Sequence, residues 1–261
     1  MPTRTASWSC PQPSVYSRRE LPTLTPGDII ASKDIPIGIA DQSLSTQIYE
    51  ALRERIIEGE LPPGSRIRER DLAEEFNVSR IPIREAMPRL ESEGFISTLP
   101  RRGAVVTEMK LEDVKELFAV RSSLDVLAAR LAAAACAAGA STTELFARLA
   151  SAEGALETGD DRRIAAANSA LHEEILRLSG NKLLISTMVP INGRVRRLFR
   201  LEAARDQRVL CAEHSRLVRE IAEGNEERAA SVASAHVEHS RAESIELFAA
   251  AHNGAAAPVN L

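Results

Sequence analysis

The spacing of apolar residues changes twice along the chain. Residues 1–40 show no sustained period and contain six prolines, a pattern that predicts a disordered tail. From 41 to 108, three runs with apolar residues three and four positions apart are followed by two short strand-like runs. From 111 to 252 the helical spacing persists alone. We therefore expect a mainly α-helical chain with two ordered domains after the tail.

Residues 41–108 predict a winged helix-turn-helix domain. Gly59 ends the first helix, and the segment Leu61-Pro62-Pro63-Gly64 forces a turn after it. Ser79 is expected to cap the third helix, which enters the DNA major groove with its N-terminal end in this motif. The expected elements are helices over 43–58, 70–76 and 79–93, a very short strand at 66–68, and a hairpin with strands at 95–98 and 104–107.

Residues 111–252 predict a bundle of about six helices. Glycines and polar pairs separate successive apolar stripes, and no strand pattern interrupts them. Helices whose apolar stripes need one another for burial form a bundle. The expected helices span 111–138, 142–157, 161–179, 181–203, 207–223 and 226–251.

Composition supports a close-packed helical core. Aromatic residues make up 3% of the 261 residues and apolar residues 44%, so aliphatic side chains and alanine must fill the interior. The three cysteines lie far apart and are odd in number, which fits a reducing compartment better than a disulfide scaffold. The sequence shows neither a signal peptide nor an apolar run long enough to span a membrane, so we expect a cytoplasmic protein.

The distribution of charge along the chain favours a DNA partner, although the net charge does not. A net charge of −4 by itself disfavours a nucleic-acid partner. Over 79–102, however, five arginines stand against three glutamates, a net charge of +2 on the elements that a winged helix presents to DNA. Arg80 and Arg84 lie four residues apart, so both project from one helix face toward guanine edges or phosphates.

The predicted hairpin tip carries a second positive group. Arg101, Arg102 and Gly103 would let guanidinium groups and backbone approach the minor groove or phosphates. Composition alone leaves open the alternative that these arginines, like those of the helix, only solvate the surface.

Many spaced positions between residues 52 and 103 follow one known pattern. They are Leu52-Arg53, Ile57-x-Gly59-x-Leu61-x-Pro63-Gly64, Leu72-Ala73, Val78-Ser79-Arg80-x-Pro82-x-Arg84-Glu85-Ala86, Leu90-x-x-Glu93-Gly94-Phe95 and Arg101-Arg102-Gly103. This set resembles the GntR family of bacterial transcription regulators. The resemblance implies DNA contacts from Arg70 and from the Ser79–Arg84 segment, and it makes Gly103 the wing glycine. Ile81 departs from the family, where a small hydroxyl residue is usual, and offers an apolar contact instead.

Three histidines fall on three different predicted helices. Imidazoles of His172, His214 and His236 that converge inside a bundle would form a metal site, as such folds commonly build one. Spacing alone leaves the alternative that each is an ordinary hydrogen-bonded or exposed residue. His239 and His252 are expected at the surface.

A second set of motifs covers the helical region. It consists of Arg121-x-x-Leu124-Asp125, Ala128-Ala129-x-Leu131-Ala132, Asn168-x-x-x-His172-x-x-Ile175, Ser179-Gly180-Asn181-x-x-Leu184 and Glu213-His214-x-x-Leu217-x-x-Glu220-Ile221-x-x-Gly224-Asn225, with His236 beyond. These residues resemble the FCD effector domain of the FadR-like branch of the same family. The resemblance implies an effector carboxylate bound by Arg121. It also implies a divalent metal ion held by Asn168, His172, His214 and His236.

Two of these positions have particular chemistry. Asn168 stands where an aspartate is common in the subfamily, so metal binding should weaken and attraction for an anion should strengthen. Neutral imidazoles suit zinc, nickel or similar ions. Arg121 has an alternative role, a salt bridge with Asp125 one helical turn away.

Together these observations predict a ligand-controlled transcription regulator. It is expected to bind a palindromic double-stranded DNA operator as a homodimer. The resemblance implies that the dimer is joined through the helical domain and that the effector is a small organic acid. The alternative is a metal-dependent enzyme that uses the three-histidine site with an open coordination position. No nucleophile or general-base signature stands near these residues, so we do not expect an enzyme.

Overall fold

The computed structural model describes residues 42–99, 103–201 and 205–253. The predicted disordered tail over residues 1–40 lies outside this part of the chain, as do Arg101 and Arg102 at the predicted hairpin tip. Helices dominate the described residues, which confirms the expected mainly α-helical fold class with an N-terminal winged helix-turn-helix.

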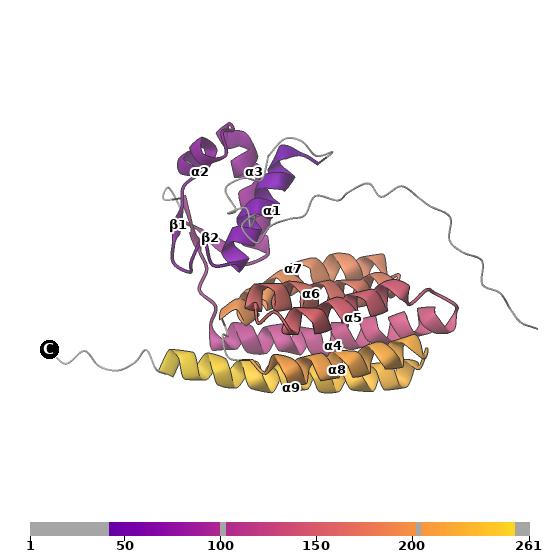
Figure 1. Cartoon of the computed structure of the whole chain (residues 1–261). Coiled ribbons are helices and arrows are strands. Elements are labelled where there is room, and N and C mark those ends of the chain that lie inside the picture. Colours follow the sequence, from indigo (N-terminus) through magenta and orange to yellow (C-terminus); the bar gives the residue numbers. More distant parts are fainter. Residues whose placement is uncertain (1–41, 100–102, 202–204, 254–261) are drawn as a thin grey trace, which may run out of the picture. The chain divides into compact units, whose positions relative to one another are not determined.

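The N-terminal region contains three helices and a small sheet (Figure 1). Its elements are α1 (Leu44–Ile57), β1 (Arg66–Ile67), α2 (Glu69–Glu75), α3 (Arg80–Ser92), β2 (Ile96–Leu99) and β3 (Gly103–Val106). The strands are antiparallel in the order β1-β3-β2, with Arg66 opposite Val105 and Ser97 also opposite Val105. The helix limits agree closely with the predicted ones. The pairing of β1 with the hairpin was not predicted.

Local sequence explains the turn that joins α2 to α3. Asn77 adopts a positive φ of 53°, which asparagine tolerates better than most residues, and it lets the chain reverse within a few positions. Ile83 and Leu90 of α3 are then fully buried against Leu52 of α1 and Phe95. The opposite side of α3 is exposed to solvent.

The remaining described residues form a helical bundle, as expected. Its helices are α4 (Leu111–Ala137), α5 (Thr143–Leu156), α6 (Asp161–Leu178), α7 (Lys182–Leu201), α8 (Gln207–Ala222) and α9 (Glu226–Asn253). The long helices α4 and α9 pack along each other, α5 packs on α6, and α8 packs on both α4 and α9 (Figure 1). Asp160 and Asp206 start α6 and α8 by accepting hydrogen bonds from backbone N–H groups of the first turn.

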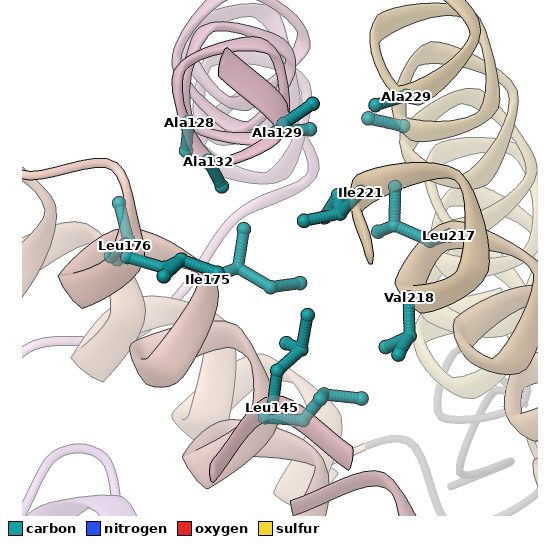
Figure 2. Close-up of a cluster of buried hydrophobic side chains, with 14 of the residues drawn as sticks. Ala128, Ala129, Ala132, Leu145, Ile175, Leu176, Leu217, Val218, Ile221 and Ala229 are labelled. Carbon is teal, nitrogen blue, oxygen red and sulfur yellow. The ribbon is translucent and has the colours of Figure 1, made fainter. Parts of the chain in front are cut away.

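Small aliphatic residues fill the largest core of the bundle. Figure 2 shows Ala128, Ala129 and Ala132 of α4 facing Ile175 of α6 and Ile221 of α8. The buried members of this cluster are alanine, leucine, isoleucine, valine and methionine, so the interpretation drawn from the low aromatic content is confirmed there. None of the described helices is long and apolar enough to cross a membrane.

Candidate functional site

Three histidines from three helices meet inside the bundle. His172 of α6, His214 of α8 and His236 of α9 place one ring nitrogen each so that these atoms all lie within 4.8 Å of one another. Nε2 of His172 lies 3.1 Å from Nε2 of His214. With zinc–nitrogen bonds of about 2.0–2.1 Å, two imidazoles on one tetrahedral ion have nitrogens about 3.3 Å apart. The cluster therefore fits a divalent metal ion.

The imidazoles of His172 and His214 are held in the neutral form. Burial lowers the pKa of His214 to about 3, with further lowering from His236, Arg121 and Arg205. Burial also places the pKa of His172 well below its ordinary value, with help from the two other imidazoles. All three rings line a cavity; His172 is partly exposed, whereas His214 and His236 are buried. Neutral imidazoles offer the lone pairs that a metal needs.

A carboxylate behind the cluster orients His236. Oε2 of Glu213 lies 2.8 Å from Nδ1 of His236, and Oε1 lies 2.6 Å from Nδ1 of His239. Burial alone would raise the pKa of Glu213, but hydrogen bonds from the two imidazoles lower it below the usual value. Glu213 belongs to the FCD-like motif, but its contact with His236 was not predicted. The i, i+3 spacing of His236 and His239 is a signal that one partner could serve both.

A cavity opens in front of the three histidines. Asn168, one helical turn before His172 on α6, lines it, as does Arg121 of α4. Four arginines contribute to the lining in all, since Arg196, Arg200 and Arg205 join Arg121. The cavity thus combines metal-ligand chemistry with positive charge, which suits an anion.

Arg121 forms the salt bridge with Asp125 that its spacing predicts, and it keeps one donor unused. It is 3% exposed, and its Nε and Nη2 atoms lie 3.0 and 2.9 Å from Oδ2 of Asp125. Nη1 of Arg121 is buried and has no hydrogen-bond partner among the residues that the structure describes. Asp125 therefore occupies one side of the guanidinium, and the other side can still donate.

The predicted DNA-reading residues lie at the exposed N-terminal end of α3. Ser79 occupies the N-cap position, but its side chain makes no capping hydrogen bond. Arg80 is exposed, and Ile81 is 66% exposed, so the apolar side chain expected to touch a base is open to solvent. Nη2 of Arg84 lies 3.0 Å from Oε2 of Glu69 in α2. This ion pair between α2 and α3 was not predicted.

The two other predicted DNA-binding positions that the structure describes differ in their surroundings. Arg70, in the first turn of α2, is 73% exposed at its side chain and lies 3.5 Å from Asp71. Gly103 begins β3 with a φ of +82°, and a Cβ there would lie 2.7 Å from the carbonyl oxygen of Ile67. The contact between β1 and β3 thus requires a glycine, whatever that residue does at DNA.

Comparisons with known proteins agree with both halves of this description. Residues 44–106 match the family "Bacterial regulatory proteins, gntR family", and residues 116–239 match the FCD domain. The HTH-type transcriptional regulator YdhC of Bacillus subtilis is 33% identical over 196 residues, which cover 74% of this chain and 87% of the relative.

Two solved structures share the fold. Escherichia coli McbR/YncC superposes with a TM-score of 0.68 at 23% identity, and the alignment covers 79% of this chain and 99% of that one. A GntR protein from Rhodococcus sp. RHA1 superposes with a TM-score of 0.67 at 21% identity, covering 78% and 99%. The gntR family and the relative are both described as regulators, so the alternative of a metal-dependent enzyme finds no support. The chain belongs to the GntR family of bacterial transcription regulators and carries an FCD domain.

Proposed function

We propose that this regulator binds a palindromic operator as a homodimer and that a small carboxylate in the helical cavity, together with a divalent metal ion, changes that binding. One observation carries the proposal. The three-histidine cluster and the unpartnered Nη1 of Arg121 line the same cavity. A buried donor without a partner costs free energy, and an anionic oxygen from a ligand would recover it.

The metal would be held by His172, His214 and His236, with the amide oxygen of Asn168 as a further ligand. Zinc, nickel or a similar ion suits this set, because imidazole is a borderline ligand and no thiolate takes part. When bound, the ion would supply positive charge and open coordination positions that a carboxylate can fill.

Arg121 is the arginine best placed to bind the effector. Arg196 and Arg200 already form ion pairs with Glu54 and Glu58 of α1. The guanidinium of Arg205 donates to the hydroxyl oxygens of Ser244 and Ser240 on α9, so it ties the start of α8 to that helix. Arg121 alone combines a fixed orientation, set by Asp125, with a donor that faces no partner among the described residues.

DNA would be read by the N-terminal end of α3. Arg80 and Arg84 present guanidinium groups for guanine edges or phosphates, and the hydroxyl of Ser79 is free of any capping role. Two copies related by a two-fold axis would place two such helices in successive major grooves. An effector that binds one arrangement of the DNA-reading domains better than the other then shifts operator affinity.

A binding titration tests this proposal. DNA selected by the protein from a random pool should show an inverted repeat, and fluorescence anisotropy would give its affinity with and without Zn²⁺ and a panel of carboxylic acids. We expect at least one acid to change that affinity. Arg121→Lys keeps the charge opposite Asp125 but loses the free Nη1 donor, so it should lose most of the response and keep basal DNA affinity. An unaltered response in this variant would contradict the assignment.

A further inference from the structure

The ligands of the three-histidine cluster bring no negative charge. Imidazoles coordinate in the neutral form, and Asn168 offers an uncharged amide. Arg121 adds a positive charge at the same cavity, where only Asp125 pairs with it among the described residues. A divalent cation placed there would gain from a negative charge close behind its ligands.

Glu213 supplies such a charge. Its Oε2 accepts a hydrogen bond from Nδ1 of His236 at 2.8 Å. Across the described ranges, no other carboxylate forms a hydrogen bond or ion pair with a member of the cluster. Glu213 and His214 are neighbours on α8, so this helix contributes a ligand to the cluster and a carboxylate to the partner helix α9.

The hydrogen bond also fixes which nitrogen of His236 is available. A neutral imidazole has one N–H group, and a carboxylate can only accept. With Nδ1–H directed at Glu213, Nε2 of His236 carries the free lone pair. A carboxylate behind a ligating histidine also raises the basicity of the imidazole.

His239 holds Glu213 in this position from the other side. Its Nδ1 lies 2.6 Å from Oε1 of Glu213, and it follows His236 by three residues on α9. The side chain of His239 is 43% exposed, whereas that of His236 is 5% exposed. Both carboxylate oxygens are thereby used, and Glu213 is kept from rotating away from the cluster.

We infer that Glu213 is a positioning residue for metal binding, which orients His236 and supplies the negative charge that the ligands lack. The inference rests on the metal site of the proposed function and adds a residue outside its ligand set. Substituting Glu213 should therefore change metal affinity without removing any ligand.

Zinc binding by the full chain tests the inference. Competition with a chromophoric chelator would give the affinity for Zn²⁺. Glu213→Gln keeps the size and one acceptor but removes the charge, so we expect binding about 10- to 100-fold weaker. Glu238→Gln is the matched control, because it removes the charge of an α9 carboxylate that pairs with Arg241 instead of a cluster histidine. It should change affinity less than about threefold. In a His236→Ala background, Glu213→Gln should add little further loss, since it acts through that imidazole.

A measurement on the metal-free protein supplies an independent readout. Long-range ¹⁵N NMR should show His236 protonated at Nδ1, and a mixture of tautomers in Glu213→Gln. If the unmodified chain binds Zn²⁺ and Glu213→Gln binds it equally well, the inference is wrong and the metal site stands. The inference is also wrong if Glu213→Gln lowers Zn²⁺ affinity as much in the His236→Ala background as it does in the unmodified chain. If the unmodified chain binds no Zn²⁺, the metal site itself is wrong and the role of Glu213 falls with it.

Discussion

Nε2 of His172 and Nε2 of His214 face each other at 3.1 Å across two helices of the bundle. One proton or one metal ion can lie between two nitrogens at this distance, whereas two protons would place two cations in contact. Burial adds to the cost of a charged ring, so the pKa values of both imidazoles lie far below the usual range. This geometry has consequences that can be measured.

Acid should destabilise the metal-free protein before its carboxylates are protonated. Burial holds the pKa of His214 at about 3, whereas an unfolded chain has a value near 6.5. Below pH 6.5 the unfolded state binds more protons than the native state, so the contribution of this neutral imidazole is complete above that pH and is lost as the pH falls toward 3. We expect stability to fall between about pH 6.5 and 5, by about 1 kcal/mol per pH unit from His214.

Urea denaturation at a series of pH values would measure this effect. A His172→Gln/His214→Gln variant serves as the control, since it should depend less on pH in the same window. Stability that stays constant between pH 6.5 and 5 would show that the two rings are not neutral and buried together.

A carboxylate at position 168 should strengthen metal binding. Asn168→Asp adds an anionic oxygen one helical turn before His172, in the same cavity lining. We expect Zn²⁺ affinity to rise about tenfold or more and the response to a carboxylate effector to weaken. Ser169→Asp adds the same charge to the same lining at the neighbouring position, so it controls for charge alone. Equal gains from both variants would argue that Asn168 is not a ligand.

Loss of Arg84 should abolish tight operator binding and leave the fold intact. Its side chain is 66% exposed, and its ion pair with Glu69 lies at the surface, where such pairs contribute little to stability. We expect Arg84→Ala to bind selected DNA at least about tenfold more weakly in a mobility-shift titration, with an unchanged melting temperature. Arg148→Ala removes an arginine of α5 that is 47% exposed and also ion-paired, and this variant should bind normally. Normal binding by Arg84→Ala would count against α3 as the reading helix.

Gly103 should matter for stability independently of DNA. An alanine there meets the backbone oxygen of Ile67 at 2.7 Å and must also adopt a φ of +82°. We expect Gly103→Ala to cost more than about 1 kcal/mol in thermal or urea denaturation. Gly59 has a similar φ of +76° with nothing within 4 Å of an added Cβ, so Gly59→Ala isolates the backbone strain. If the two variants lose the same free energy of unfolding, the close approach of β1 to Gly103 contributes nothing to the cost of the substitution.

The helices could be predicted from the sequence because their limits are encoded locally. Glycines such as Gly94 and Gly224 adopt positive φ values where the predicted helices end, and Asp160 and Asp206 cap the helices that follow. The pairing of Arg66 with Val105 could not be predicted, because it depends on tertiary approach between segments about forty residues apart.

The site was predictable only in part, because some of its contacts also depend on tertiary packing. The histidine cluster followed from residue type, motif and helix assignment. The pair Arg121–Asp125 followed from its i, i+4 spacing. The contacts Arg84–Glu69 and Glu213–His236 join different helices, so spacing gives no direct sign of them. Each required knowledge of how the helices pack.

The alanines of α4 limit how the cavity beside the three histidines can change during evolution. Ala128 and Ala129 belong both to the core and to the cavity lining. An alanine can be shortened only to glycine, which costs about 1 kcal/mol inside a helix, so this wall can become bulkier but not thinner. Met188 and Val195 of α7 can be trimmed or enlarged. Relatives that accommodate larger acids should therefore differ in α7 while α4 stays nearly the same.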